Sequence, residues 1–162
     1  MSELAFLSPG EARAADGFAP AISSPLARAL EGARGIRDLS LAGKLEVRGP
    51  DVEWLAADLD VIRITPARAL VVCAPEECVE LRRSLPGLVV DVTGALAGIV
   101  LEGAGLMRRL TDLDLSTLPA AGKFADVPAL VSETEGSFRI FFPQEYGHSV
   151  VEIVRDAQAG LA

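Results

Sequence analysis

Two aspartates are the side chains of this sequence most suited to binding chemistry. Asp91 interrupts an apolar run of strand length, Leu88 to Val92. A carboxylate in that position either faces solvent or is held by backbone donors at a ligand site. Asp114 follows Asp112 after an expected helix, and a metal site there would need further oxygen ligands that the sequence does not supply. We interpret this pair as helix-terminating and capping residues and Asp91 as a candidate ligand-binding residue.

Other patterns that carry catalysis or metal binding are missing from the sequence. The single histidine, His148, has no nucleophile paired with it in the sequence, which favours a position on a helix surface. Neither a GxxxxGK[ST] phosphate loop nor a GxSxG elbow occurs. Cys73 and Cys78 occupy apolar positions, for which core packing is the favoured interpretation over redox chemistry. Two cysteines and one histidine exclude a zinc site of the usual ligand count.

The charge balance argues against several classes of partner. The 162 residues contain 15 Lys and Arg against 23 Asp and Glu, which gives a formal net charge of −8. Because neutralising phosphates requires a basic surface, we expect no nucleic acid and no anionic membrane as a partner. No window approaches the ~20 apolar residues of a membrane span, and no signal peptide is recognised at the N-terminus. A cytoplasmic location is the resulting expectation.

The hydrophobic pattern predicts an N-terminal arm, residues 1–22, followed by one domain, residues 23–162. The arm is rich in Ala, Gly, Pro and Ser and has no clean period. Alternating or continuous apolar runs predict strands over residues 44–48, 61–65, 69–73, 88–92, 96–101, 127–132 and 137–142. Apolar spacings of three and four predict helices over residues 52–59, 75–85, 103–110 and 143–157, and residues 119–122 are expected to form a loop.

The order of these elements predicts an α+β fold. Two connections are short enough for hairpins, one through residues 93–95 and one through Glu135-Gly136. A mixed, mainly antiparallel sheet with helices packed on it accommodates both hairpins and helices. Strand, helix and strand follow one another twice, which favours split βαβ units.

Several stretches resemble the folate-binding domain of glycine cleavage T-proteins (aminomethyltransferases). The likeness is carried by Asp91-Val92-Thr93-Gly94, by Gly103 and by the run from Leu106 to Leu115. Further matching pieces cover residues 35–49, 70–75, 126–131 and 138–143. The closest likeness is to the gamma subunit of heterotetrameric sarcosine oxidase, a shortened member of that superfamily. The resemblance implies the fold of the T-protein N-terminal domain.

Departures from the catalytic members of the superfamily point to the gamma-subunit branch. T-proteins usually have Ser-His-Met where this chain has Thr93-Gly94-Ala95, and their Asn-Asp pair appears here as Leu113-Asp114. The paired-aspartate strand that supplies the T-protein catalytic acid has no counterpart between Phe124 and Phe142. Leu113-Asp114-Leu115 is the form that the gamma subunit tends to have.

The resemblance therefore implies a non-catalytic accessory subunit. Its partners would be larger flavoprotein and folate-binding subunits of a sarcosine oxidase, which demethylates sarcosine with flavin and tetrahydrofolate. This chain would then bind no cofactor itself, and the flavin would sit on the partner subunits.

Two alternatives stay open beside that hypothesis. A stand-alone folate-binding or aminomethyltransferase-like protein would place Asp91, Thr93 and Asp114 around a tetrahydrofolate pterin. Carboxylate acceptors suit the amino and ring N–H groups of a pterin. A self-associating structural homologue without a ligand would instead form a stable homo-oligomer.

Overall fold

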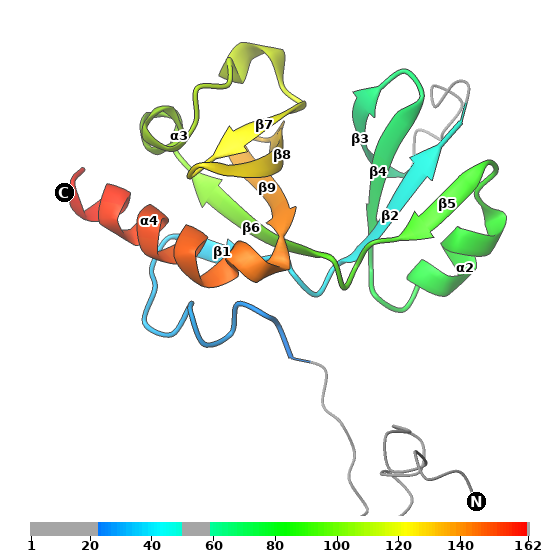
Figure 1. The fold of residues 1–162 in the computed structure, drawn as a ribbon, viewed down its shortest axis with the longest axis horizontal. Helices are drawn as coiled ribbons and strands as arrows, with labels where there is room; N and C mark the ends of the chain where they lie inside the picture. The colour runs from blue at the N-terminus through cyan, green and yellow to red at the C-terminus, as the bar shows by residue number, and fades with distance from the viewer. Residues whose placement is uncertain (1–22, 50–58, 162) are drawn as a thin grey trace, which may run out of the picture.

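The computed structural model describes residues 23–49 and 59–161, which form two antiparallel sheets connected by crossing segments (Figure 1). The large sheet has the strand order β1-β6-β9-β8-β7 and the small sheet has the order β3-β4-β2-β5. The α+β class is confirmed, and every strand pairing between described residues is antiparallel. The predicted arm, residues 1–22, and all but the last residue of the predicted helix 52–59 lie outside the described residues.

The large sheet packs its apolar face against two helices. Its strands are β1 (Ile36–Asp38), β6 (Leu96–Glu102), β7 (Ala120–Phe124), β8 (Val127–Thr134) and β9 (Ser137–Pro143). The covering helices are α3 (Ala104–Leu110) and α4 (Gly147–Ala159), and single turns of 3-10 helix occur at η2 (Leu115–Thr117) and η3 (Gln144–Tyr146). The alternation along β9 turns Phe138, Ile140 and Phe142 toward this core, where they meet Val150 and Val154 of α4.

One predicted hairpin is confirmed and the other is wrong. β8 and β9 pair through a turn in which Glu135 and Gly136 both have positive φ, as a tight hairpin turn requires. The segment 93–95, however, joins two different sheets, because β5 is an edge strand of the small sheet and β6 lies between β1 and β9 in the large one. The local hydrophobic pattern indicates two strands joined by a short connection. It does not indicate the strand with which each of them pairs.

The prediction of a loop at residues 119–122 is also wrong, because most of this segment belongs to a strand. Ala120–Phe124 forms β7, which pairs with β8. Alanine and glycine have low strand propensity, so this segment does not stand out in the sequence. Gly122 has a packing reason, because a Cβ atom there would lie 2.5 Å from Leu113 Cδ2.

The small sheet contains one split βαβ unit. Its strands are β2 (Gly43–Arg48), β3 (Asp60–Thr65), β4 (Arg68–Cys73) and β5 (Leu88–Asp91), and α2 (Cys78–Ser84) connects β4 to β5. Since both β4 and β5 run antiparallel to β2 between them, they are parallel to each other. Of the described residues, Leu45, Val47, Ala69, Val71 and Cys78 form the small core.

A third apolar cluster joins the two sheets. Ile62 and Leu70 of the small sheet pack with Leu130 and Phe141 of the large sheet. Gly98, the cross-strand partner of Phe141, leaves room for that ring, because a Cβ atom there would lie 3.0 Å from it. The chain leaves the large sheet after β1 and returns at β6, so the small sheet is an insertion between two paired strands.

Backbone and hydroxyl groups fasten the crossing segment that follows β1 to strand β6. Leu39 N donates to Gly98 O at 2.8 Å, and Gly98 N donates to Ser40 Oγ at 3.2 Å.

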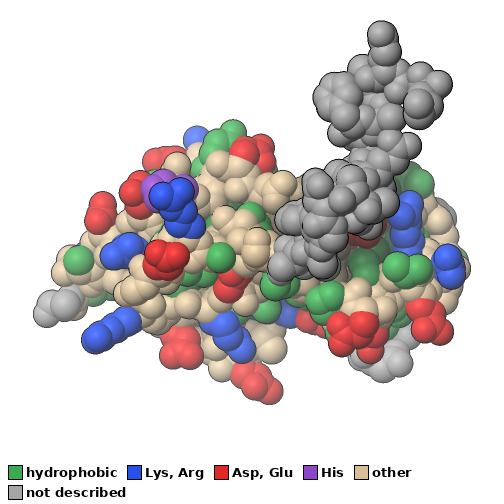
Figure 2. All heavy atoms as spheres, turned by 90° about the horizontal axis from the view of Figure 1, so that it is seen from below, with side chains coloured by type: hydrophobic (Ala, Val, Ile, Leu, Met, Phe, Trp, Pro, Cys, Tyr) green, Lys and Arg blue, Asp and Glu red, His purple; other side chains and the backbone are tan. Residues whose placement is uncertain are grey.

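No helix among the described residues is both long and apolar enough to cross a membrane. On the face shown in Figure 2, basic side chains lie scattered among acidic ones.

Candidate functional site

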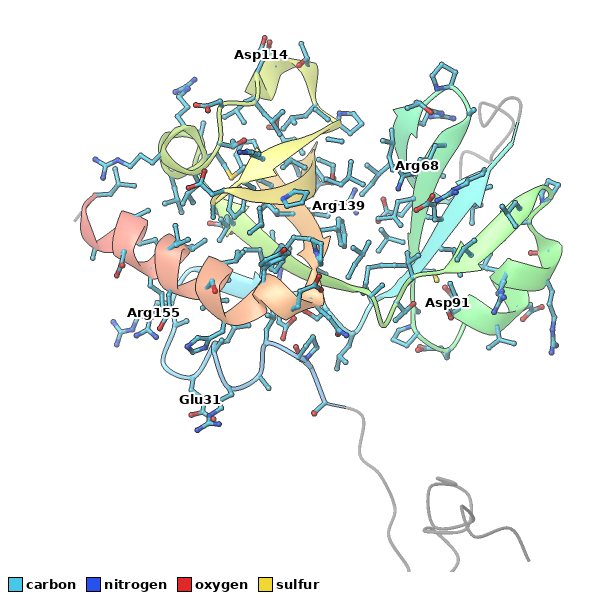
Figure 3. All side chains as sticks on the ribbon, viewed as in Figure 1. Glu31, Arg68, Asp91, Asp114, Arg139 and Arg155 are labelled. Carbon is cyan, nitrogen blue, oxygen red and sulfur yellow. The ribbon has the colours of Figure 1, made fainter. Side chains whose placement is uncertain are left out.

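The three residues predicted to surround a pterin lie in two different parts of the molecule. Asp91 ends β5 of the small sheet and Thr93 follows it in the crossing segment. Asp114 precedes η2, above the large sheet, far from Asp91 in the view of Figure 3. The structure therefore brings Asp91 and Thr93 together and leaves Asp114 apart from them.

Asp91 and Thr93 fasten the crossing segment to β2. Asp91 Oδ1 accepts the Thr93 N–H at 2.9 Å, and Thr93 Oγ1 accepts the Lys44 N–H at 2.9 Å. The Cys78 thiol donates to Asp91 Oδ2 at 3.7 Å. The backbone hydrogen bond from Thr93 lowers the pKa of Asp91 below the value of a free carboxyl, although partial burial opposes it. These contacts explain both residues as parts of a turn.

Asp114 caps the short helix η2. Its Oδ1 accepts the Ser116 hydroxyl at 2.7 Å and the Ser116 N–H at 3.0 Å. The side-chain hydrogen bond and then the backbone one lower the pKa of Asp114. The capping interpretation of this residue is thus confirmed.

The other candidate groups also have local structural roles. His148 is exposed on α4 and its Nε2 lies 3.2 Å from Glu152 Oε1, so the helix-surface interpretation is confirmed. Cys73 and Cys78 are free thiols. Burial, together with the neighbouring Cys78, raises the pKa of Cys73 to about 11, which keeps it protonated at neutral pH. Within residues 23–49 and 59–161, no group of three or more His, Cys, Asp and Glu side chains could hold a metal ion.

Lys44 is a buried charge that sequence reasoning did not single out. The side chain is 0% exposed on β2, and its Nζ donates to Ser40 O at 2.8 Å and Ala42 O at 2.7 Å. Burial lowers the pKa of Lys44, while Asp38 and Asp91 act against that effect. The alternation Lys44 to Arg48 shows which residues share a face, but not that the large sheet covers it.

The same face of β2 contributes to a groove of about 450 Å³ between the two sheets. Ile64 and Leu70 line it from the small sheet, and Leu130 and Phe141 line it from the large sheet. Arg68 stands on the wall formed by the small sheet (Figure 3). This volume is within the range of small-molecule pockets, which combine an apolar lining with a few polar groups.

Glu46 holds two arginines at the polar end of this groove. Arg68 donates to both Glu46 oxygens, at 2.9 Å each, and Arg48 Nε donates to Oε1 at 2.5 Å. Arg48 and Arg68 are direct cross-strand partners, an unfavourable pairing of like charges that the carboxylate bridges. Burial alone would raise the pKa of Glu46, but the hydrogen bonds from Arg68 and Arg48 outweigh it and lower that pKa.

A second charge contact joins the two sheets outside the lining of this groove. Arg139 of β9 forms an ion pair with Asp60 of β3. Within the described part of the chain, Arg139 Nε and Ser132 Oγ are buried without a hydrogen-bond partner. Ser132 and Arg139 are cross-strand partners, so both polar groups face the space between the sheets.

Comparison with known proteins places the fold among solved structures. No family model matches the chain and no curated protein does. The structure matches a chain of the heterotetrameric sarcosine oxidase from Corynebacterium sp. U-96 in complex with pyrrole 2-carboxylate. The TM-score is 0.70 at 18% identity, covering 86% of this chain and 95% of that chain.

A second match is the ligand-free regulatory subunit of aspartate kinase from Thermus thermophilus. Its TM-score is 0.51 at 15% identity, covering 76% of this chain and 97% of that chain. Both matched chains are parts of multi-subunit proteins. At these identities the likeness establishes the fold, which is that of a sarcosine oxidase chain.

Proposed function

We propose that this chain is a non-catalytic accessory subunit that resembles the gamma subunit of a heterotetrameric sarcosine oxidase. The observation that carries the proposal is the fold likeness, which covers 86% of this chain and 95% of the matched chain. Two chains that cover each other so fully are similar in length, so the whole subunit serves as the comparison. In this function the flavin and the folate sit on larger partner subunits.

The sequence supports the same assignment within the T-protein superfamily. Thr93-Gly94-Ala95 and Leu113-Asp114 stand where catalytic members have other residues. The structure gives Asp91, Thr93 and Asp114 hydrogen bonds to neighbouring groups of the same chain. A subunit that acts by associating with partners needs no catalytic residue of its own, and the structural contacts of these three residues agree with such a role.

Reconstitution with purified subunits tests this function. The larger subunits of a heterotetrameric sarcosine oxidase should be produced with and without this chain. We expect a complex of defined stoichiometry by size-exclusion chromatography with light scattering, and sarcosine-dependent oxygen uptake only when the larger subunits are present. Sarcosine turnover by this chain alone, or a mixture that never assembles, would contradict the proposal.

Folate binding by this chain remains the competing proposal, and it predicts a different result. A reduced folate at about 100 times its Kd adds about 2.7 kcal/mol to the free energy of unfolding. Thermal denaturation with folinic acid would show this as a clear rise in Tm. Because Asp91 and Asp114 lie apart, Asp91→Asn and Asp114→Asn should not both abolish such a shift.

A further inference from the structure

The groove between the sheets has an uneven distribution of charge. Its lining is mostly apolar, with Leu70, Leu130 and Phe141 at its base. Glu46 and Arg68 are the charged residues among the described lining, and Arg48, two residues along β2 on the same face, reaches Glu46. One carboxylate between two guanidinium groups leaves a net charge of about +1 at this end of the groove.

The two arginines keep hydrogen-bonding capacity beyond Glu46. Arg68 uses Nε and Nη2 for Glu46, and Arg48 uses Nε. Their other guanidinium N–H groups have no acceptor in the described part of the chain. The side chains of Arg48 and Arg68 are 55% and 47% exposed, so these donors can be reached from the groove or from solvent. Glu46, only 8% exposed, holds Arg68 by a bidentate pair.

We infer that this groove binds a small organic acid, with its carboxylate on Arg68 and its apolar body against Leu70, Leu130 and Phe141. Arginine recognises a carboxylate with two parallel N–H donors. Among the described lining residues, the excess of positive charge lies at the end of the groove formed by Glu46 and Arg68. The remaining lining suits a hydrocarbon or aromatic body. The inference does not depend on the proposed accessory function, because it concerns this chain alone.

An NMR titration of the full chain provides the test. Phenylacetate is the probe, and phenylacetamide is the neutral analogue of nearly the same shape. We expect amide shifts concentrated on β4, β8 and β9, with a Kd for the acid about tenfold below that for the amide, as expected for a charge-assisted hydrogen bond.

Matched variants separate the groove from general attraction of anions. Arg68→Met should weaken phenylacetate binding about tenfold, whereas Arg155→Met, which removes the same charge on distant α4, should leave it unchanged (Figure 3). Glu46→Gln removes the competing carboxylate and keeps both arginines, so it should bind the acid several times more tightly and the amide unchanged. Circular dichroism would verify that each variant is folded.

Three outcomes would overturn the inference. Equal affinity for acid and amide would show an apolar groove without anion recognition. Equal competition by inorganic phosphate would show an exposed anion contact without use of the groove. Absence of groove-localised shifts in the wild type and in Glu46→Gln at millimolar phenylacetate would show that nothing of this class binds there.

Discussion

The two sheets solve the problem of burial differently. In residues 23–49 and 59–161, the core between the large sheet and its two helices contains eighteen buried apolar residues. Among the residues that the structure describes, the core of the small sheet contains five buried apolar residues, beneath the seven-residue helix α2. Its opposite face buries a lysine and a glutamate, Lys44 and Glu46, beside the apolar Ile62 and Leu70. The stability of the small sheet therefore depends on polar groups that must all find partners.

The difference shows where binding chemistry can arise in this fold. The core of the large sheet is stabilised by the apolar surface area that it buries, and among the described residues it contains no charged side chain. The face between the sheets carries Lys44, Glu46 and Arg68 from one side and Arg139 from the other. This face is thus both less well packed and better equipped to recognise another molecule.

The largest expected effect comes from the core of the large sheet. Phe124 is fully buried there, so Phe124→Ala should lower the free energy of unfolding by about 3–5 kcal/mol. Leu45→Ala, a truncation of fewer atoms in the small core, should cost closer to ~2 kcal/mol because it leaves a smaller cavity. Urea denaturation measures both, and a larger loss for Leu45→Ala would reverse the comparison.

The next effect concerns the buried lysine. Lys44→Met keeps most of the volume but removes two donors to backbone carbonyls, so we expect a loss of about 1–3 kcal/mol at pH 7. The folded-state pKa of Lys44 lies below its ordinary 10.5, so between these values the unfolded chain binds more protons. The wild type therefore gains stability relative to Lys44→Met as the pH rises toward 10.5. Urea denaturation from pH 7 toward pH 10.5 measures this difference in the free energy of unfolding between wild type and Lys44→Met. A difference that became smaller as the pH rose would contradict the prediction.

A smaller effect is expected at the groove. Glu46→Gln should cost about 1 kcal/mol at pH 7, because its arginine partners are half-exposed and partly screened. The pKa of Glu46 is lowered below 4.5, so its contribution is complete above that pH and disappears as the pH falls through the folded-state pKa. The stability difference should therefore vanish in acid, and a difference independent of pH would point to packing instead.

The smallest effect belongs to the exposed cap at Asp114. Asp114→Ala removes the acceptor of two exposed hydrogen bonds from Ser116. We expect a slight fall in Tm, below that of Asp91→Ala, whose carboxylate orders the segment between the sheets. Differential scanning calorimetry measures the Tm of both variants. A larger fall in Tm for Asp114→Ala would show that η2 contributes more to stability than the segment between β5 and β6.

Much of the local structure could be predicted from the sequence. Alternation in residues 137–142 and the Glu135-Gly136 turn specify the β8–β9 hairpin, and apolar spacing specifies α3 and α4. The sheet to which β5 and β6 belong could not be predicted, because strand partners are fixed by long-range packing. β7 escaped recognition because its small residues pack as a strand only once β8 lies beside them.

The candidate site was less predictable than the fold. Asp91 stands out as an acid inside an apolar run and Asp114 as one of a pair with Asp112, yet both make local turn and cap contacts. The groove depends on Glu46 and Arg68, which stand 22 positions apart and meet through the β2–β4 register. An alternating strand pattern shows which residues share a face, but whether water or a second sheet covers that face depends on the whole topology.

The insertion of the small sheet between β1 and β6 affects how the chain reaches its native state. β1 is synthesised first and must wait for β6, more than fifty residues later, before it can pair. The entropy of closing a loop grows with its length, by about 0.6 kcal/mol for each doubling. If the small sheet forms first, its pairing of Leu45 with Asp91 brings the two ends of that loop together. The inserted small sheet would then lower the entropic cost of pairing β1 with β6.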